Sequence, residues 1–188
     1  LQRSRELILT LLDALPPGSQ VMVASFSGDK RIVLPPTTDR SLLASTLSAF
    51  SAGVSGVALP DGLFDIVESL GNQEADARAI LLVSAGRVRE GDLQFEDPLN
   101  AATGRQIRIF ALAVGQGDMK LLRRITRVTG GEYVRLEVAD AAALAHSISP
   151  SPDSAKAPPS ERAEDLPSPR SESRTSAGLL GAAAVFFS

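Results

Sequence analysis

The segment Gly115–Lys120 (GQGDMK) is the part of the chain whose residue types and spacing come closest to a nucleotide-binding site. Glycine-rich turns at a helix N-terminus present backbone N–H groups that can hold a phosphate. The segment lacks the spacing of a P-loop or of a full dinucleotide fingerprint. The pattern therefore favours a tight turn between a strand and a helix, with Asp118 placed favourably at the positive end of the helix dipole.

Other residue types that carry catalysis are scarce. The chain has no cysteine, which excludes thiolate chemistry, and its single histidine, His146, argues against a histidine-rich metal site or a Ser-His-Asp triad. Ser25 and Ser27 stand at the end of an apolar run with no base beside them. No two carboxylates are spaced as an acid/base pair. We therefore predict that the chain is not an enzyme and uses no cofactor.

Charge is balanced over the chain, with 19 basic and 22 acidic residues and a net charge of −3. A nucleic-acid partner would favour a basic surface, so none is expected. One predicted helix carries a local basic patch formed by Lys120, Arg123, Arg124 and Arg127. A solvated face is the favoured interpretation of this patch, and contact with a partner or a lipid surface is the alternative. His146 is expected on the surface near a helix end.

Hydrophobic periodicity predicts the elements that position these residues. Strands are expected at Val21–Phe26, Arg31–Leu34, Ala79–Val83, Ile107–Val114 and Tyr133–Leu136. Helices are expected at Leu1–Leu15, around Leu42–Phe50 with Asp39 or Ser41 as the cap, from Pro60 to Leu70, at Pro98–Thr103, around Leu121–Val128 and at Ala141–Ile148. Strands that alternate with helices imply parallel crossovers. The expected fold class is α/β, a doubly wound and mainly parallel sheet in which Arg31–Leu34 forms an antiparallel edge hairpin with the strand before it.

Four segments together resemble the von Willebrand factor A-type domain family over about Leu1–Ile148. The most specific is ALPPGSQVMVASFS, followed in order by GVALPDGLFDIVESL, ARAILLVSAGR and GRQIRIFALAVGQGDMKLLRRITRVTGGEYVRL. The resemblance implies a strand order of 3-2-1-4-5-6. It also implies that the central first strand, which carries an Asp-x-Ser-x-Ser metal motif in the family, is missing before Leu1. The two strands beside that place, Val21–Phe26 and Ala79–Val83, are therefore expected to face a gap or to close upon each other.

The resemblance also assigns two metal-ligand positions, and both lack a side-chain oxygen. The family pattern Gly-Thr-Ala-Leu-Tyr-Asp-Ala-Leu lies over Gly56–Leu63, which places Val57 at the threonine. The Asp of the family turn after its fourth strand lies over Ala85. A shifted alignment offers Ser55 in place of Val57, but it breaks the register of Asp61. We therefore interpret the site as degenerate, with no bound metal.

The leading hypothesis is a protein–protein interaction module that works without a metal. The candidate partner-binding rim consists of Ser55, Gly56, Arg87, Arg89 and Glu90, although a plain charged loop is the simpler interpretation of the last three. The partner is unknown. The alternatives are a metal-dependent (Mg or Mn) adhesion module and a nucleotide-binding or hydrolytic α/β enzyme, which Gly115–Lys120 alone supports.

The C-terminal part of the chain differs in composition. Residues 149–176 contain six prolines and eight serines, so we expect a disordered linker. Residues 177–188 are apolar and are expected to be helical. They are shorter than the ~20 residues that span a bilayer. They are interpreted as the start of a transmembrane helix or as an apolar terminus. If they are the start of a transmembrane helix, the domain at 1–148 is expected to be membrane-anchored and extracytoplasmic, as a part of a longer protein.

Overall fold

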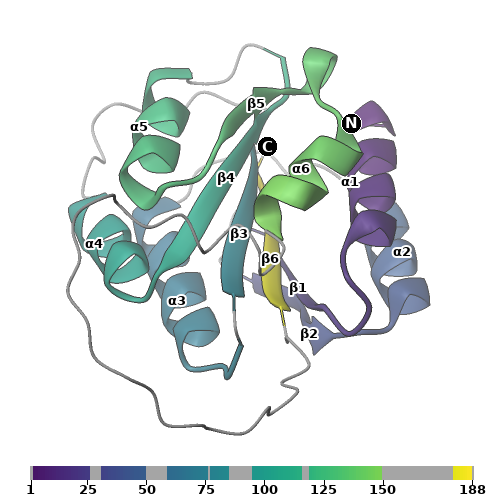
Figure 1. Ribbon diagram of the computed structural model, residues 1–188, viewed down its shortest axis with the longest axis horizontal. Helices are drawn as coiled ribbons and strands as arrows, with labels where there is room; N and C mark the ends of the chain where they lie inside the picture. Colours follow the sequence, from purple (N-terminus) through teal and green to yellow (C-terminus); the bar gives the residue numbers. More distant parts are fainter. Residues whose placement is uncertain are drawn as a thin grey trace, which may run out of the picture.

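A six-stranded sheet forms the centre of the computed structural model, which describes residues 2–25, 31–49, 59–75, 77–84, 95–115, 119–149 and 180–187 (Figure 1). The strand order is β2-β1-β6-β3-β4-β5. The strands are β1 (Gln20–Ser25), β2 (Arg31–Thr37), β3 (Ala77–Ser84), β4 (Ile107–Ala113), β5 (Tyr133–Arg135) and β6 (Leu180–Phe187). β2 runs antiparallel to β1, and every other neighbouring pair is parallel. The predicted α/β class and the antiparallel edge hairpin are confirmed.

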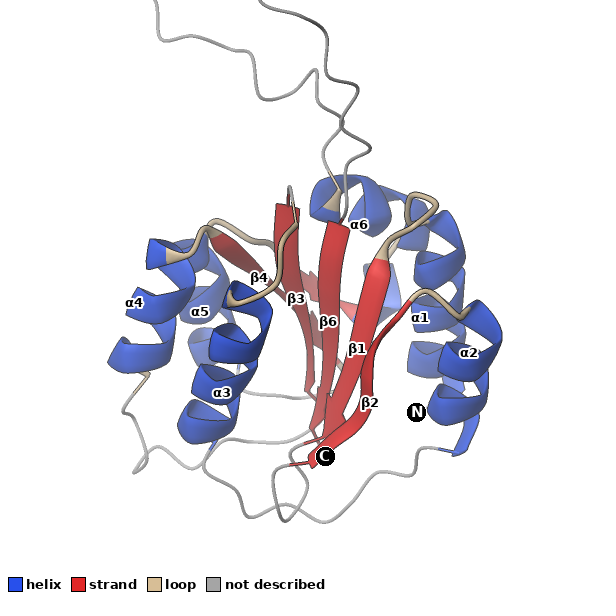
Figure 2. Ribbon diagram, turned by 90° about the horizontal axis from the view of Figure 1, so that it is seen from below, coloured by secondary structure: helices blue, strands red, loops and turns tan. Residues whose placement is uncertain are grey.

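Helices cover both faces of this sheet. Figure 2 shows α3, α4 and α5 on one face and α1, α2 and α6 on the other. Their bounds are α1 (Gln2–Ala14), α2 (Arg40–Ala49), α3 (Leu59–Gly71), α4 (Glu96–Gly104), α5 (Met119–Thr129) and α6 (Ala141–Ile148), with a short 3₁₀ turn at Leu136–Val138. Each agrees with a predicted helix, and Asp39 caps α2 by accepting the N–H of Leu42 at 3.0 Å.

Strand alternation divides the apolar residues between two cores. Successive side chains of a strand point to opposite faces. In β3, Ile80 and Leu82 therefore join the core under α3, α4 and α5, whereas Leu81 and Val83 join the core under α1, α2 and α6. A continuous apolar run such as that of β3 is stable in this sheet because helices cover both of its faces.

Strand β6 corrects two expectations about the chain. It lies in the centre of the sheet, parallel to β1 on one side and to β3 on the other, so these strands neither face a gap nor pair with each other. Its residues were expected to be helical, but they form a strand. The backbone N–H and C=O groups of two central strands need partners, and an apolar segment with a β-branched and an aromatic end can supply them as a strand. Among the described residues, no helix is long and apolar enough to span a bilayer.

Arg108 attaches α6 to the sheet. It extends from β4, where its guanidinium donates to the carbonyl oxygens of Ser147 at 2.9 Å and Ile148 at 2.8 Å. It also lies 5.3 Å from the centre of the Phe110 ring. Burial lowers the pKa of this guanidinium from its usual value, but an arginine stays charged at neutral pH. A cation at a helix C-terminus interacts favourably with the last carbonyls and with the helix dipole.

We expect Arg108→Met to reduce the free energy of unfolding by about 2 kcal/mol, because two charge-assisted hydrogen bonds are lost while the aliphatic stem is kept. Urea denaturation measures the change. Arg124→Met, on the exposed side of α5, is the matched control and should change stability by less than ~0.5 kcal/mol. Equal losses in the two variants would show that the bonds to α6 contribute nothing specific.

Candidate functional site

The carboxyl ends of four parallel strands meet at one edge of the sheet. The last residue of β1, Ser25, is aligned with Phe186 of β6, and the last residue of β3, Ser84, is aligned with Phe187 of β6 and with Ala113 of β4. The Val114 N–H donates to the Ser84 carbonyl at 2.8 Å, which holds β3 and β4 together at this edge. Doubly wound sheets bind their ligands outside this edge, so it is the candidate functional site.

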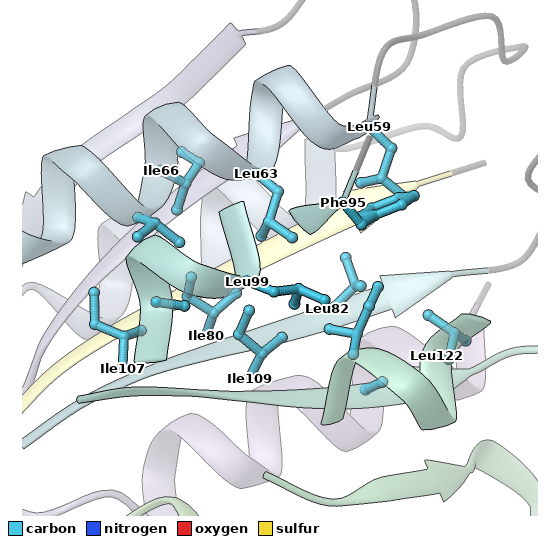
Figure 3. Packing of buried hydrophobic residues seen from close by; sticks show 14 of the residues in the cluster. Leu59, Leu63, Ile66, Ile80, Leu82, Phe95, Leu99, Ile107, Ile109 and Leu122 are labelled. Atoms are coloured by element: carbon cyan, nitrogen blue, oxygen red, sulfur yellow. The ribbon is translucent and has the colours of Figure 1, made fainter. Parts of the chain in front are cut away.

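Three helices begin at the same edge. α4 and α5 each connect two parallel strands, and α3 leads directly into β3, so the N-termini of all three helices lie beside the carboxyl ends of the strands. Two apolar residues fix the starts of α3 and α4 in the core, Leu59 with 4% of its surface exposed and Phe95 with 1%. Figure 3 draws both on the same side of the cluster as Leu82, and draws Ile66 and Ile107 at its other end. The first residues of α3 and α4 are therefore held firmly by the core at this edge.

Polar groups at this edge are few among the described residues. Ser25 and Ser84 are buried, with 7% and 4% of their surfaces exposed. Asp61 in α3, and Glu96 and Asp97 in α4, lie in the first turns of their helices, where the dipole favours a carboxylate. All three are exposed to solvent. Within the described ranges, no group of three or more His, Cys, Asp or Glu side chains is arranged to hold a metal ion.

The residues that the sequence assigned to the site lie outside the described residues. They are Ser55, Gly56, Val57, Ala85, Arg87, Arg89 and Glu90. The described chain stops at Ala49 and resumes at Leu59, and it stops at Ser84 and resumes at Phe95. Both interruptions have one end on the carboxyl edge of the sheet. The sequence reasoning missed the burial of Phe95, whose only signal was an aromatic residue directly before a helix start.

The turn after β4 has one feature that requires glycine. Gly115 has a φ of +69°, in the left-handed region that other residues avoid. A Cβ at this position would meet no atom within 4 Å, so the backbone conformation and not the space around it demands glycine. This agrees with a tight strand-to-helix turn. Gln116, Gly117 and Asp118, which a phosphate cradle would need, lie outside the described residues.

His146 lies away from this edge. It is exposed, as expected, and helps to line a shallow depression of about 380 Å³ together with Arg108, Phe110, Gly130, Gly131, Glu132 and Ser147. The Arg108 guanidinium is already bonded to the end of α6, so the depression offers no uncommitted arginine. Nothing in the sequence indicated this grouping, because its residues come from three separate segments.

A family comparison decides between the possible doubly wound folds. The family model for the von Willebrand factor type A domain matches residues 1–150, most of the chain. The chain belongs to the von Willebrand factor type A domain family. The observed strand order reproduces the order that the resemblance implied, with β6 in the place of the central first strand. Domains of this family generally mediate protein–protein interaction and are typically not enzymes.

The individual proteins that the chain resembles share only a modest fraction of its residues. The chain is 28% identical over 121 residues to an uncharacterized protein of Borreliella burgdorferi, and it spans about a third (35%) of that relative's length. Among solved structures, it is similar to a conserved hypothetical protein BatB from Bacteroides thetaiotaomicron, with a TM-score of 0.62 and 23% identity over 79% of this chain and 86% of that one. It is also similar to an aerotolerance-related membrane protein from Bacteroides fragilis, with a TM-score of 0.59 and 20% identity over 78% and 85%. These identities establish a common fold.

Proposed function

We propose that this von Willebrand factor type A domain binds a protein partner through the loops at the carboxyl edge of its sheet, without a metal ion. The observation that carries the proposal is the meeting of four strand ends and three helix starts at that edge. Loops held by such a scaffold are well placed for recognition, because the support stays rigid while loop sequence varies. The candidate contact residues remain Ser55, Gly56, Arg87, Arg89 and Glu90.

Metal independence rests on the residue types at the two family ligand positions. Mg²⁺ demands near-octahedral coordination by oxygen. Val57 and Ala85 would present methyl groups to a strongly hydrated ion, and water removed from the ion would not be replaced. The same two residues leave apolar surface at the strand ends, which suits direct contact with a protein.

Calorimetric titration with Mg²⁺ and Mn²⁺ tests this part. We expect no binding heat from the chain as it stands. The double variant Val57→Thr/Ala85→Asp restores the two family oxygen ligands. The strand at the central position, β6, has the sequence LGAAAVFF with no side-chain oxygen, so this variant should also bind the ions weakly at most. Micromolar binding by the unaltered chain would contradict the proposal and favour a metal-dependent adhesion module.

Site-specific cross-linking tests the location of the partner contact. A photoreactive residue is placed at position 87, or as a control at Ala142, which is exposed on α6. We expect a covalent adduct with another protein from position 87 alone, at the same yield with and without a chelator. An adduct from Ala142 with none from position 87 would place the interface elsewhere, and loss of the adduct on chelation would show metal dependence.

We further propose that the domain functions at a membrane of the cell envelope. The support is the description of the structurally similar Bacteroides fragilis protein as a membrane protein. The anchor is not assigned to residues 180–187, because a strand at the centre of the sheet cannot also be a spanning helix. Fractionation of cells that express the whole natural protein should recover it with membranes, and recovery in the soluble fraction would refute this proposal.

A further inference from the structure

Helix α5 presents a cationic strip on the side opposite its buried face. Leu121, Leu122 and Ile125 join the core, whereas the four basic residues point away from it and are exposed: Lys120, Arg123, Arg124 and Arg127. Residues three and four apart are neighbours on a helix surface. The three arginines therefore form one continuous strip along the helix, and Val128, with 47% of its surface exposed, lies at its border.

The arginines of this strip are not neutralised by a carboxylate in the described part of the fold. In the described part of the chain, Arg123, Arg124 and Arg127 form no ion pair, whereas Arg105 is held by Glu68 through two contacts at 2.6 and 2.7 Å. Arg123 is oriented by Tyr133, whose ring centre lies 5.1 Å from its guanidinium carbon. Such a concentration of positive charge, in a chain whose net charge is −3, is available to a ligand of opposite charge.

We propose that the outer face of α5 is a docking surface for an acidic protein segment. A guanidinium binds a carboxylate through two parallel hydrogen bonds, and Arg127, which lies four residues after Arg123 and three after Arg124, matches carboxylates presented at similar spacing. Arg123, Arg124 and Arg127 lie in the second and third turns of α5, beyond the first turn that begins at the carboxyl edge of the sheet. The inference therefore holds whether or not the loops at that edge bind the partner of the proposed function.

An acidic protein segment fits this surface better than a membrane does. A helix that binds a bilayer through its own surface buries an apolar face among the lipids. In α5 that face is already covered by the sheet, which leaves only charge and one half-exposed valine for a lipid surface. A few cations alone give weak attraction to anionic lipid at physiological salt. Carboxylates on a peptide can instead approach each guanidinium individually.

The test measures binding of a fluorescent, Ala-based helical peptide with glutamates at i and i+4 spacing to the full 188-residue chain. The charge reversal Arg124→Glu/Arg127→Glu removes the strip. The matched control is Arg3→Glu/Arg135→Glu, at two exposed positions outside α5, which gives the protein the same net charge. We expect the α5 variant to weaken binding by about tenfold or more and the control by less than about twofold. Circular dichroism confirms that both variants are folded.

Two further measurements separate the alternatives. Arg123→Lys/Arg124→Lys/Arg127→Lys keeps the charge but loses the planar fork, so it should weaken binding by several-fold and not abolish it. Vesicles of phosphatidylglycerol and phosphatidylcholine should not bind the chain at ~150 mM salt. Absence of peptide binding, an equal loss in the α5 variant and its control, or α5-dependent vesicle binding without peptide binding would each overturn the inference. Cross-linking at position 87 reports on the carboxyl-edge loops independently of all three.

Discussion

Replacing Ala183 with proline is expected to lower the free energy of unfolding by about 3 kcal/mol or more, the largest effect of any single change considered. Ala183 lies in the middle of β6, aligned with Met22 of β1 and Ile80 of β3. Proline has no N–H to donate, and in the middle of a sheet its ring also displaces the neighbouring strand. Because β6 alone joins β1 to β3, the damage reaches both halves of the sheet. Urea or thermal denaturation measures the loss.

The chain offers two checks on this prediction. Ala155→Pro, in the proline- and serine-rich segment outside the described residues, should leave the denaturation midpoint unchanged. The natural Pro35 and Pro36 lie in β2, an edge strand, at the register shift between the pairs Val21–Thr37 and Val23–Leu34, where the ladder of hydrogen bonds is already irregular. An Ala183→Pro variant that unfolds at the midpoint of the unaltered chain would mean that β6 contributes nothing to the stability of the sheet.

The second large effect is expected for Gly131→Ala, at about 2–3 kcal/mol of lost stability. A Cβ at this position would lie 2.0 Å from the carbonyl oxygen of Ile109 and 2.5 Å from its carbonyl carbon. Both atoms belong to the backbone of β4, so no side-chain rotation relieves the clash. The segment after α5 would have to move away from β4. This would also disturb the 3.1 Å bond from the Ile109 N–H to the Thr129 hydroxyl.

Two other glycines separate the effect of steric contact from the effect of backbone conformation. Gly130→Ala meets no atom within 4 Å but has a φ of +72°, so it should cost about 1 kcal/mol. Gly104→Ala, at the end of α4, meets no atom within 4 Å and has no positive φ, so it should be neutral or slightly stabilising. If Gly131→Ala were no worse than Gly130→Ala, close contact with β4 would not be the reason for glycine at position 131. Chemical denaturation of the three variants gives the order.

The chemical character of the candidate site can be predicted from its residue types, but the packing around the site cannot. Val57 and Ala85 lack side-chain oxygens in any conformation, so the argument against a metal needs only the sequence and the family pattern. The buried position of Phe95 depends on how α4 lies against α3 and β3, and no local pattern reports it. The same holds for the contact of Arg123 with Tyr133, which joins residues from two elements.

The sequence by itself determined the elements and their class. Helical spacing predicted α3, and an uninterrupted apolar run predicted that β3 is covered on both faces, because each signal arises between residues close together in the chain. The sequence offered Asp39 or Ser41 as the cap of α2, and the structure has Asp39 in that role. Only the tertiary structure decided that residues 180–187 form a strand at the centre of the sheet. A short apolar run can be a helix or a strand, and the choice depends on the distant backbone groups of β1 and β3 that it can satisfy. In the same way, the role of Arg108 depended on carbonyl groups about forty residues away, which folding alone brings within reach.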